Sequence, residues 1–235
     1  MSLPKELADK LRSPFNPEDI SWKPQTVNYS AKTALAVAYA DPRAYVDRLN
    51  DVLGVGGWSD EYHFIATPYN KFIKGKKAWK DKPATEDKEV AGNKLVVTCV
   101  IVIRSNNEVL ACVSSTGDSD ASDDNAATSA EAQAFKRAAM KLGLGRYLYD
   151  LPKINAGYDN GWTNPSQLTL PDWALPKFYC TDCKAEIKSI KHGDSTFSVA
   201  QLLANSQRKY QKDLCADCQR NLTETAKNNL GRAIA

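Results

Sequence analysis

Four of the six cysteines form two Cys-x-x-Cys pairs, and this spacing constrains the fold of the 235-residue chain more than any other feature. A Cys-x-x-Cys turn presents two thiolates to one ion, and two such turns complete a tetrahedral Zn²⁺ site. The first residues, MSLPKELADKLR, lack the apolar core of a secretion signal, so we expect a reducing compartment, where metal is favoured over disulfides. The sequence therefore predicts a structural zinc site formed by Cys180, Cys183, Cys215 and Cys218.

Residues 177–235 would form the zinc-finger domain around this site. We expect a hairpin around the first cysteine pair, a helix over Ser198–Tyr210 between the pairs, and a helix that begins at the second pair and runs through Asn229. Redox use of the thiols is an alternative, but no thioredoxin-like pattern surrounds either pair. Four cysteines would leave no ligand position for the water of a catalytic zinc. The two other cysteines, Cys99 and Cys112, lie in apolar stretches and are interpreted as small buried side chains.

The region before the zinc-finger domain predicts an α+β fold. Residues 95–103 (LVVTCVIVI) are rich in β-branched side chains, and with Glu108–Thr116 they predict an antiparallel hairpin, preceded by a strand over Trp58–Ala66. Helices are expected over Leu3–Leu11, Arg43–Leu53 and Ala126–Leu142. In the last of these, small side chains recur every three or four residues, which lets a helix lie close to a sheet. This stripe consists of Ala127, Ala130, Ala134, Ala138 and Leu142.

Several classes of function are disfavoured by the composition. No apolar run reaches the ~18–20 residues that a membrane span requires. Two histidines leave little material for histidine-based catalysis, and no G-x-x-x-x-G-K-[ST] loop is present to hold a nucleoside triphosphate. We therefore expect a protein of the cytoplasm, acting in a bacterial nucleoid or in the host cytoplasm if viral, that is not an enzyme.

Charge is arranged in patches although the formal net charge is only +3. Residues 71–82 contain six lysines, among them Lys74, Lys76 and Lys77, with aromatic residues interleaved. Cations that neutralise phosphates beside rings that stack on bases suit a single nucleic-acid strand, and a solvated loop is the alternative. Residues 118–124 are acidic; we interpret them as capping the following helix and complementing its dipole, and a metal-dependent nuclease site is the weaker alternative. The acids are Asp118, Asp120, Asp123 and Asp124.

Three segments resemble the single-strand-annealing recombination mediators, the Rad52-type superfamily, and in particular its bacterial DdrA branch. They are residues 17–23 (PEDISWK), 45–58 (YVDRLNDVLGVGGW) and 131–148 (EAQAFKRAAMKLGLGRYL), so the resemblance covers roughly residues 14–152. It implies an antiparallel β-β-β-α core with an N-terminal helix, rings of subunits, and single-stranded DNA in a positively charged groove. Residues 1–152 would be this core and 153–176 a linker.

The resemblance also implies DNA-binding residues. Lys136 and Arg137 would face the groove, and Lys23 stands where the family commonly has arginine, without its bidentate geometry. Lys141 shares a helix face with Arg137 at four-residue spacing and joins this set. The resemblance thus predicts ATP-independent binding and annealing of single-stranded DNA in recombination or repair. The partners expected are DNA, further copies of the chain, and a recombinase or single-strand-binding protein. A zinc-finger regulator of duplex DNA or RNA is the alternative.

Overall fold

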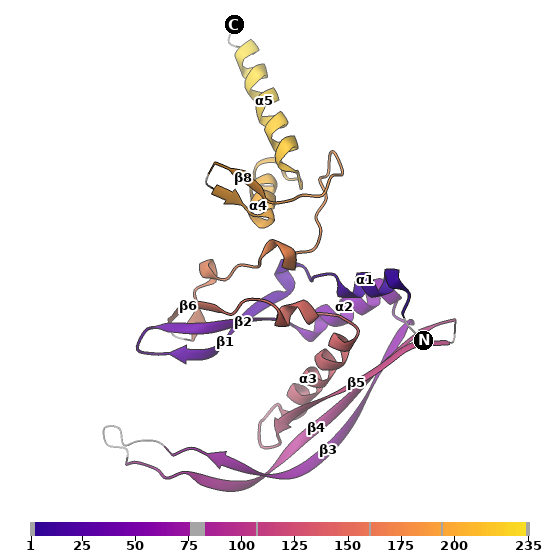
Figure 1. Cartoon of the computed structure of the whole chain (residues 1–235), viewed down its shortest axis with the longest axis vertical. Coiled ribbons are helices and arrows are strands. Elements are labelled where there is room, and N and C mark those ends of the chain that lie inside the picture. Colours follow the sequence, from indigo (N-terminus) through magenta and orange to yellow (C-terminus); the bar gives the residue numbers. More distant parts are fainter. Residues whose placement is uncertain (1–2, 76–82, 107, 160, 194, 234–235) are drawn as a thin grey trace. The chain divides into compact units, whose positions relative to one another are not determined.

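The structure, a computed structural model, describes residues 3–75, 83–106, 108–159, 161–193 and 195–233. The chain forms two compact units, residues 1–163 and residues 164–235 (Figure 1). Among the described residues, no helix combines the length and the apolar character needed to cross a bilayer.

A three-stranded antiparallel sheet followed by a helix forms the centre of the first unit. The strands are β3 (Trp58–Ile73), β4 (Lys88–Ser105) and β5 (Glu108–Asp120), in the order β3-β4-β5, and the helix is α3 (Ala126–Lys141). The predicted β-β-β-α core is therefore confirmed. The β3–β4 ladder is longer than predicted and continues to the pair Ile73 and Lys88. Polar side chains obscured this continuation in the sequence, because backbone hydrogen bonds hold a ladder whatever the side chains are.

Helix α3 lies against β4 and β5, as its small side chains predicted (Figure 1). Ala130, Ala134 and Ala138 are fully buried, whereas Ala127, in the first turn of the helix, is exposed and falls outside the stripe. The closest approach occurs at Gly117 of β5, where an added Cβ would lie 2.2 Å from the Ala130 carbonyl oxygen. Glycine at this position is what lets the helix backbone approach the strand.

The two cysteines of this sheet differ in their surroundings. Cys99 of β4 is buried, as the sequence predicted, but Cys112 of β5 is exposed. Side chains alternate along a strand, so Cys112 lies on the face of β5 opposite to Gly117, which packs against α3. The prediction that Cys112 is buried is therefore wrong.

A second sheet in this unit was not expected from the sequence. It contains β1 (Ile20–Asn28), β2 (Thr33–Ala40), β6 (Ile154–Asp159) and β7 (Trp162–Thr163), in the order β1-β2-β6-β7. Strand β2 consists largely of alanine, which is depleted in strands, and its buried positions are held by packing instead. Strand β6 lies in the segment predicted as a linker; the structure differs there because residues 154–157 pair with β2.

The other helices of the first unit follow the sequence closely. They are α1 (Lys5–Arg12) and α2 (Pro42–Leu53), with short 3-10 turns at η1 (Pro17–Asp19) and η2 (Arg146–Tyr149). The Asp41 side chain caps α2 by accepting a hydrogen bond from the Arg43 amide, and Gly54 ends it with a φ of 76°. The buried ring of Phe15 packs on Tyr45 with 4.9 Å between centroids, which joins the N-terminal segment to α2.

The described part of the second unit contains two α-helices, two 3-10 turns and a short pair of antiparallel strands. These elements are η3 (Pro165–Gln167), η4 (Asp172–Ala174), β8 (Ile190–His192), β9 (Ser195–Phe197), α4 (Val199–Tyr210) and α5 (Ala216–Ala233). Both predicted helices are confirmed, and Ser198 and Gln201 form a capping box at the start of α4. The core of the unit includes Leu175, Cys180, Ile187, Leu202 and Leu214.

Candidate functional site

A groove of about 460 Å³ opens on the first unit between the β1–β2 sheet and helix α3. Lys23 of β1 and Tyr39 of β2 line one side, and Lys136 and Arg137 of α3 line the other. Lys153, which follows the turn η2, adds a further cation to the lining. The fold thus brings together three of the predicted site residues from segments that are far apart in the sequence.

The ring of Tyr39 lies close to two of these cations. The ammonium nitrogen of Lys23 is 5.6 Å from the ring centroid and that of Lys136 is 6.0 Å from it, both within cation–π range. Burial lowers the pKa of Lys136 below its ordinary value, and the nearby charge of Lys23 lowers it further, whereas Asp41 opposes the shift. Two like charges near one ring raise the local positive potential, which favours an anion at this place.

The predicted helix face with Arg137 and Lys141 lies along the edge of β5. Arg137 donates a hydrogen bond to the Thr116 carbonyl oxygen at 2.9 Å, and Lys141 donates one to the carbonyl oxygen of Ser114. Gln133 donates to the next alternate carbonyl, that of Asp118, at 3.2 Å. Three side chains spaced by four residues therefore satisfy carbonyls spaced by two along an edge strand. Arg137 also lines the groove, but Lys141 is not among the groove residues.

The lysine-rich segment is described only in part. Lys71 lies in β3 and Lys74 directly follows that strand, in neither case as part of the groove lining. Lys76 and Lys77 lie outside the described residues. Their role in DNA binding stays a prediction.

Sequence reasoning missed Lys153, Tyr39 and Tyr149 as groove residues. Lys153 was assigned to the linker, although it directly follows Pro152, the last residue of the region that the resemblance covers. Tyr39 carried a weak signal as the only aromatic residue of an alanine-rich stretch that we did not recognise as a strand. The signal for Tyr149 was its position within the predicted core, residues 1–152, directly after the last resembling segment.

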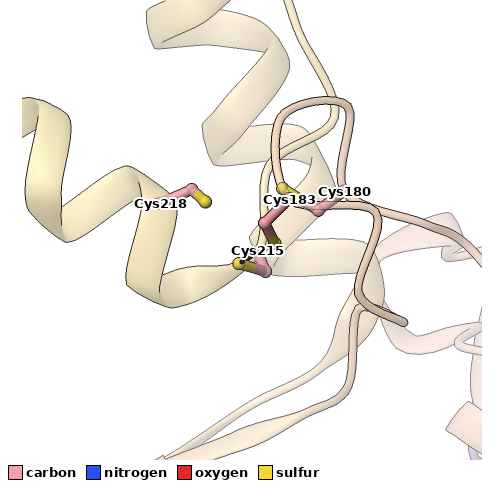
Figure 2. Close-up of side chains that lie close together, drawn as sticks. All are labelled: Cys180, Cys183, Cys215 and Cys218. Carbon is pink, nitrogen blue, oxygen red and sulfur yellow. Dashed lines mark hydrogen bonds between the residues drawn. The ribbon is translucent and has the colours of Figure 1, made fainter.

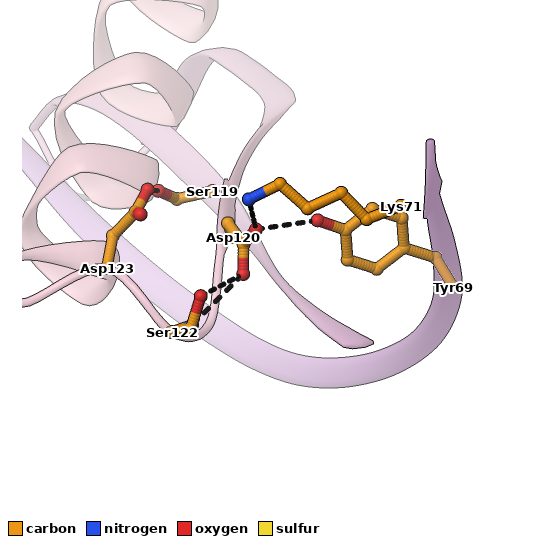
Figure 3. A network of polar contacts seen from close by, with 6 residues as sticks. All are labelled: Tyr69, Lys71, Ser119, Asp120, Ser122 and Asp123. Carbon is orange, nitrogen blue, oxygen red and sulfur yellow. Dashed lines mark hydrogen bonds and ion pairs between the residues drawn. The ribbon is translucent and has the colours of Figure 1, made fainter. Parts of the chain in front are cut away.

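Two acids of this segment, Asp118 and Asp120, bind lysines and do not cap α3. Asp120 accepts hydrogen bonds from the Tyr69 hydroxyl at 2.8 Å and from Lys71 at 2.5 Å (Figure 3). Its second oxygen accepts from the Ser122 hydroxyl at 2.7 Å, and Asp118 pairs with Lys94 at 2.8 Å. The prediction that the side chains of these acids cap α3 is wrong. The N-cap residue is Asn125, and its side chain makes no capping hydrogen bond.

These contacts explain the electrostatics of the segment. Hydrogen bonds from Lys71, Ser122 and Tyr69 hold the pKa of Asp120 far below its usual range. Two of these donors come from β3 across the sheet, so the acidic segment ties the end of β5 to the outer half of β3 (Figure 3). The carboxylates of Asp118 and Asp120 are therefore engaged in ion pairs with lysines of the same sheet.

The four cysteines of the second unit converge, as predicted (Figure 2). Their sulfur atoms all lie within 4.8 Å of one another, and Cys183 and Cys215 are 3.7 Å apart. A tetrahedral ion with bonds of about 2.3 Å to sulfur requires sulfur–sulfur distances of about 3.8 Å. A disulfide would instead require about 2.05 Å. The donor set and its spacing therefore fit one tetrahedral metal ion.

The thiols influence one another's ionisation. Burial raises the pKa of Cys180, but backbone N–H groups of Cys183, Cys215 and Asp182 outweigh it and bring that pKa down to about 6. Hydrogen bonds with Cys215, Cys180 and Cys183 raise the pKa of Cys218 well above its usual value. These backbone N–H groups therefore stabilise the Cys180 thiolate before any metal binds, and a metal cation would stabilise the other thiolates.

The groove and its surroundings fall within a recognised family. The family model described as "Rad52/22 family double-strand break repair protein" matches residues 4–164. The chain belongs to the Rad52/22 family. The resemblance seen in the three sequence segments is thereby confirmed, and every residue that lines the groove lies within the family match.

Two curated relatives of this Rad52/22 family chain carry the name "Single-stranded DNA-binding protein DdrA". The protein from Deinococcus radiodurans is 30% identical over 172 residues, which cover 73% of this chain and 68% of the relative. The protein from Deinococcus deserti is 28% identical over 172 residues, covering 73% of this chain and 71% of the relative. The family match ends at residue 164, where the second unit begins, so the four cysteines lie beyond it.

Proposed function

We propose that the chain binds single-stranded DNA in the groove of its first unit and anneals complementary strands without nucleotide hydrolysis. The observation that carries this proposal is the set of cations that line one groove inside the family match: Lys23, Lys136, Arg137 and Lys153. The two relatives named as single-stranded DNA-binding proteins support the same substrate.

Annealing places a requirement on the proposed DNA-binding groove. The sugar–phosphate backbone must be held while the base edges stay free to pair with a second strand. Lysine and arginine contacts to phosphates hold the backbone without reading sequence. Lys141 bonds to the β5 edge and, on this proposal, positions α3, whereas Lys136 and Lys23 contact DNA. Arg137 serves both roles, because it lines the groove and bonds to β5.

We further propose that subunits assemble into a ring or filament. One chain offers only a few cations, and repetition around an oligomer would multiply affinity along a continuous strand. Strand β3 carries large apolar side chains that are exposed in the single chain, including Phe64, Ile65 and Phe72, and assembly would cover them. In a bacterium, action on chromosomal DNA would place the protein in the nucleoid.

The four-cysteine site would hold zinc. Cys180, Cys183, Cys215 and Cys218 would supply four thiolates, which is the donor set of closed structural zinc sites. Bound zinc would cross-link the two Cys-x-x-Cys turns and would stabilise a unit that has only a small core.

The direct test is annealing of complementary oligonucleotides by the purified protein without ATP, together with particle mass in the presence and absence of single-stranded DNA. We expect faster annealing than the spontaneous rate and a multi-subunit particle. The Lys23→Ala/Lys136→Ala double variant should lose the acceleration, and Lys10→Ala, an exposed lysine paired with Glu6 on α1, should keep it. A monomer that binds duplex in preference to single strands would contradict the proposal.

A further inference from the structure

The hairpin that leads into the first cysteine pair presents a surface that the groove does not use. Tyr179 pairs with Glu186 in an antiparallel bridge, and the Ile187 amide donates to the Phe178 carbonyl oxygen at 2.8 Å. Because successive side chains of a strand point to opposite faces, Phe178 and Ile187 enter the core of the unit. Tyr179 and Glu186 therefore share the outer face.

This outer face combines an aromatic ring with flanking cations. The Tyr179 side chain is 57% exposed, and within the described part of the chain its ring contacts no other ring and no cation. Lys177 and Lys188 flank it, both more than two-thirds exposed. Their ammonium groups lie 3.7 and 3.9 Å from the Glu186 carboxylate, which lies on the same face. The face therefore carries a net positive charge beside an unpartnered ring.

We propose that this face binds single-stranded nucleic acid, with a base stacked on Tyr179 and phosphates held by Lys177 and Lys188. Exposed rings between cations form the platform that unpaired strands bind without sequence preference. A paired duplex has no free base face to offer such a ring, so the platform selects an unpaired strand. This interaction lies on the second unit and is independent of the groove on the first.

The metal site gives the ring a rigid support. Tyr179 directly precedes Cys180, which is buried, and the Cys180 amide donates to the Ala185 carbonyl oxygen at 2.8 Å to close the hairpin. A ring on a fixed hairpin loses little conformational entropy when a base stacks on it. Removal of metal should therefore weaken this interaction even where the lysines remain.

Substitution of Glu186 distinguishes strand binding at this face from a purely structural role of the hairpin. Its carboxylate is partly covered between the two lysines at distances longer than a good charge-assisted hydrogen bond. A bound phosphate would compete with it for the same ammonium groups. Removing the acid should therefore tighten binding, an effect that a purely structural role of the hairpin would not produce.

The test measures binding of a labelled oligothymidylate to the full-length, zinc-loaded protein by fluorescence anisotropy. Tyr179→Ala should weaken binding by about tenfold, Tyr179→Phe should not weaken it, and Glu186→Gln should tighten it about two- to fivefold. Lys188→Ala should lower the salt dependence of binding, whereas Lys209→Ala, an exposed lysine on α4, should not. Zinc content of each variant controls for folding of the unit.

The same variants in the Lys23→Ala/Lys136→Ala background separate this proposal from the proposed function. Loss of affinity on Tyr179→Ala in that background supports the platform even if the groove variants alone change nothing. Unchanged affinity for Tyr179→Ala, Lys188→Ala and Glu186→Gln in both backgrounds would overturn it. If Tyr179→Ala loses zinc, the comparison of Glu186→Gln with the parent decides the matter, and no tightening would then overturn the proposal.

Discussion

Lys23 and Lys136, which are 113 positions apart in the sequence, direct their ammonium groups to one ring, with Nζ atoms 5.6 and 6.0 Å from the centroid of Tyr39. Two cations this close repel each other in the free protein. A phosphate placed between them would relieve that repulsion, and the aromatic ring offsets part of it until DNA arrives. The positive charge of the groove therefore favours the binding of an anion.

The pKa of Lys136 gives this groove a characteristic pH dependence. Burial and then Lys23 lower that pKa, so in the free protein the ammonium loses its proton at a lower pH than an ordinary lysine does. DNA binding favours the charged form, and affinity should therefore fall as the pH rises through this lowered pKa. Lys136→Arg should keep the neutral-pH affinity and shift the fall to higher pH, because guanidinium stays charged. Affinity measured across the alkaline range checks this; identical profiles for both proteins would contradict it.

Gly117 tests the close packing of α3. In Gly117→Ala the new Cβ would lie 2.2 Å from the Ala130 carbonyl oxygen and 2.6 Å from the Ala134 nitrogen, so the helix must move. We expect a loss of about 1–3 kcal/mol in the free energy of unfolding of the first unit. Gly56→Ala is the matched control, since nothing lies within 4 Å of its added Cβ. Denaturant unfolding measures both, and equal stabilities for the two variants would count against this packing.

Asp120 predicts how the sheet responds to acid. Its folded pKa is depressed, chiefly by Lys71 and then by Ser122 and Tyr69, so its contribution to stability is present above the unfolded pKa. That contribution should be lost as the pH falls from the unfolded pKa through the folded one. Asp120→Asn should therefore lower the thermal midpoint at neutral pH, and the difference from the parent should shrink in strong acid. A difference that does not change with pH would argue against the ion pair.

Metal removal should affect the second unit selectively. Cys180→Ser should reduce the bound zinc and destabilise residues 164–235, because the free energy of zinc binding contributes to folding. Cys112→Ser is the control, because Cys112 is an exposed cysteine on β5 and is not one of the four clustered cysteines. Elemental analysis with hydrogen exchange before and after chelation provides the measurement. Equal protection of this unit with and without metal would exclude a structural ion.

The sequence predicted those parts of the fold in which pattern and packing agree. The β-branched run of β4, the small-residue stripe of α3 and the spacing of the cysteines each indicated one structure. The β1–β2–β6 sheet was missed because alanine in β2 gives little strand signal and its partner β6 lies more than a hundred residues later. Pairing between distant segments has no local signature.

The candidate site, like the fold, was predicted from the sequence only in part. Lys23, Lys136 and Arg137 were predicted through the family resemblance, and the structure places all three on one groove. Lys141 shares a helical face with Arg137, but periodicity could not reveal that this face meets the carbonyls of β5. Lys153 was missed because its position depends on a turn and a strand that the sequence pattern did not indicate.

The most direct test of the central claim is the salt dependence of single-stranded DNA affinity for the parent protein and for Lys136→Ala. If Lys136 holds a phosphate, the variant should bind more weakly, and the slope of log K against log salt should become shallower by about one for each phosphate that is no longer neutralised. The slope should be the same for oligonucleotides of different sequence. A parent and variant with equal slopes and equal affinities would contradict the claim that this groove holds the strand by its phosphates.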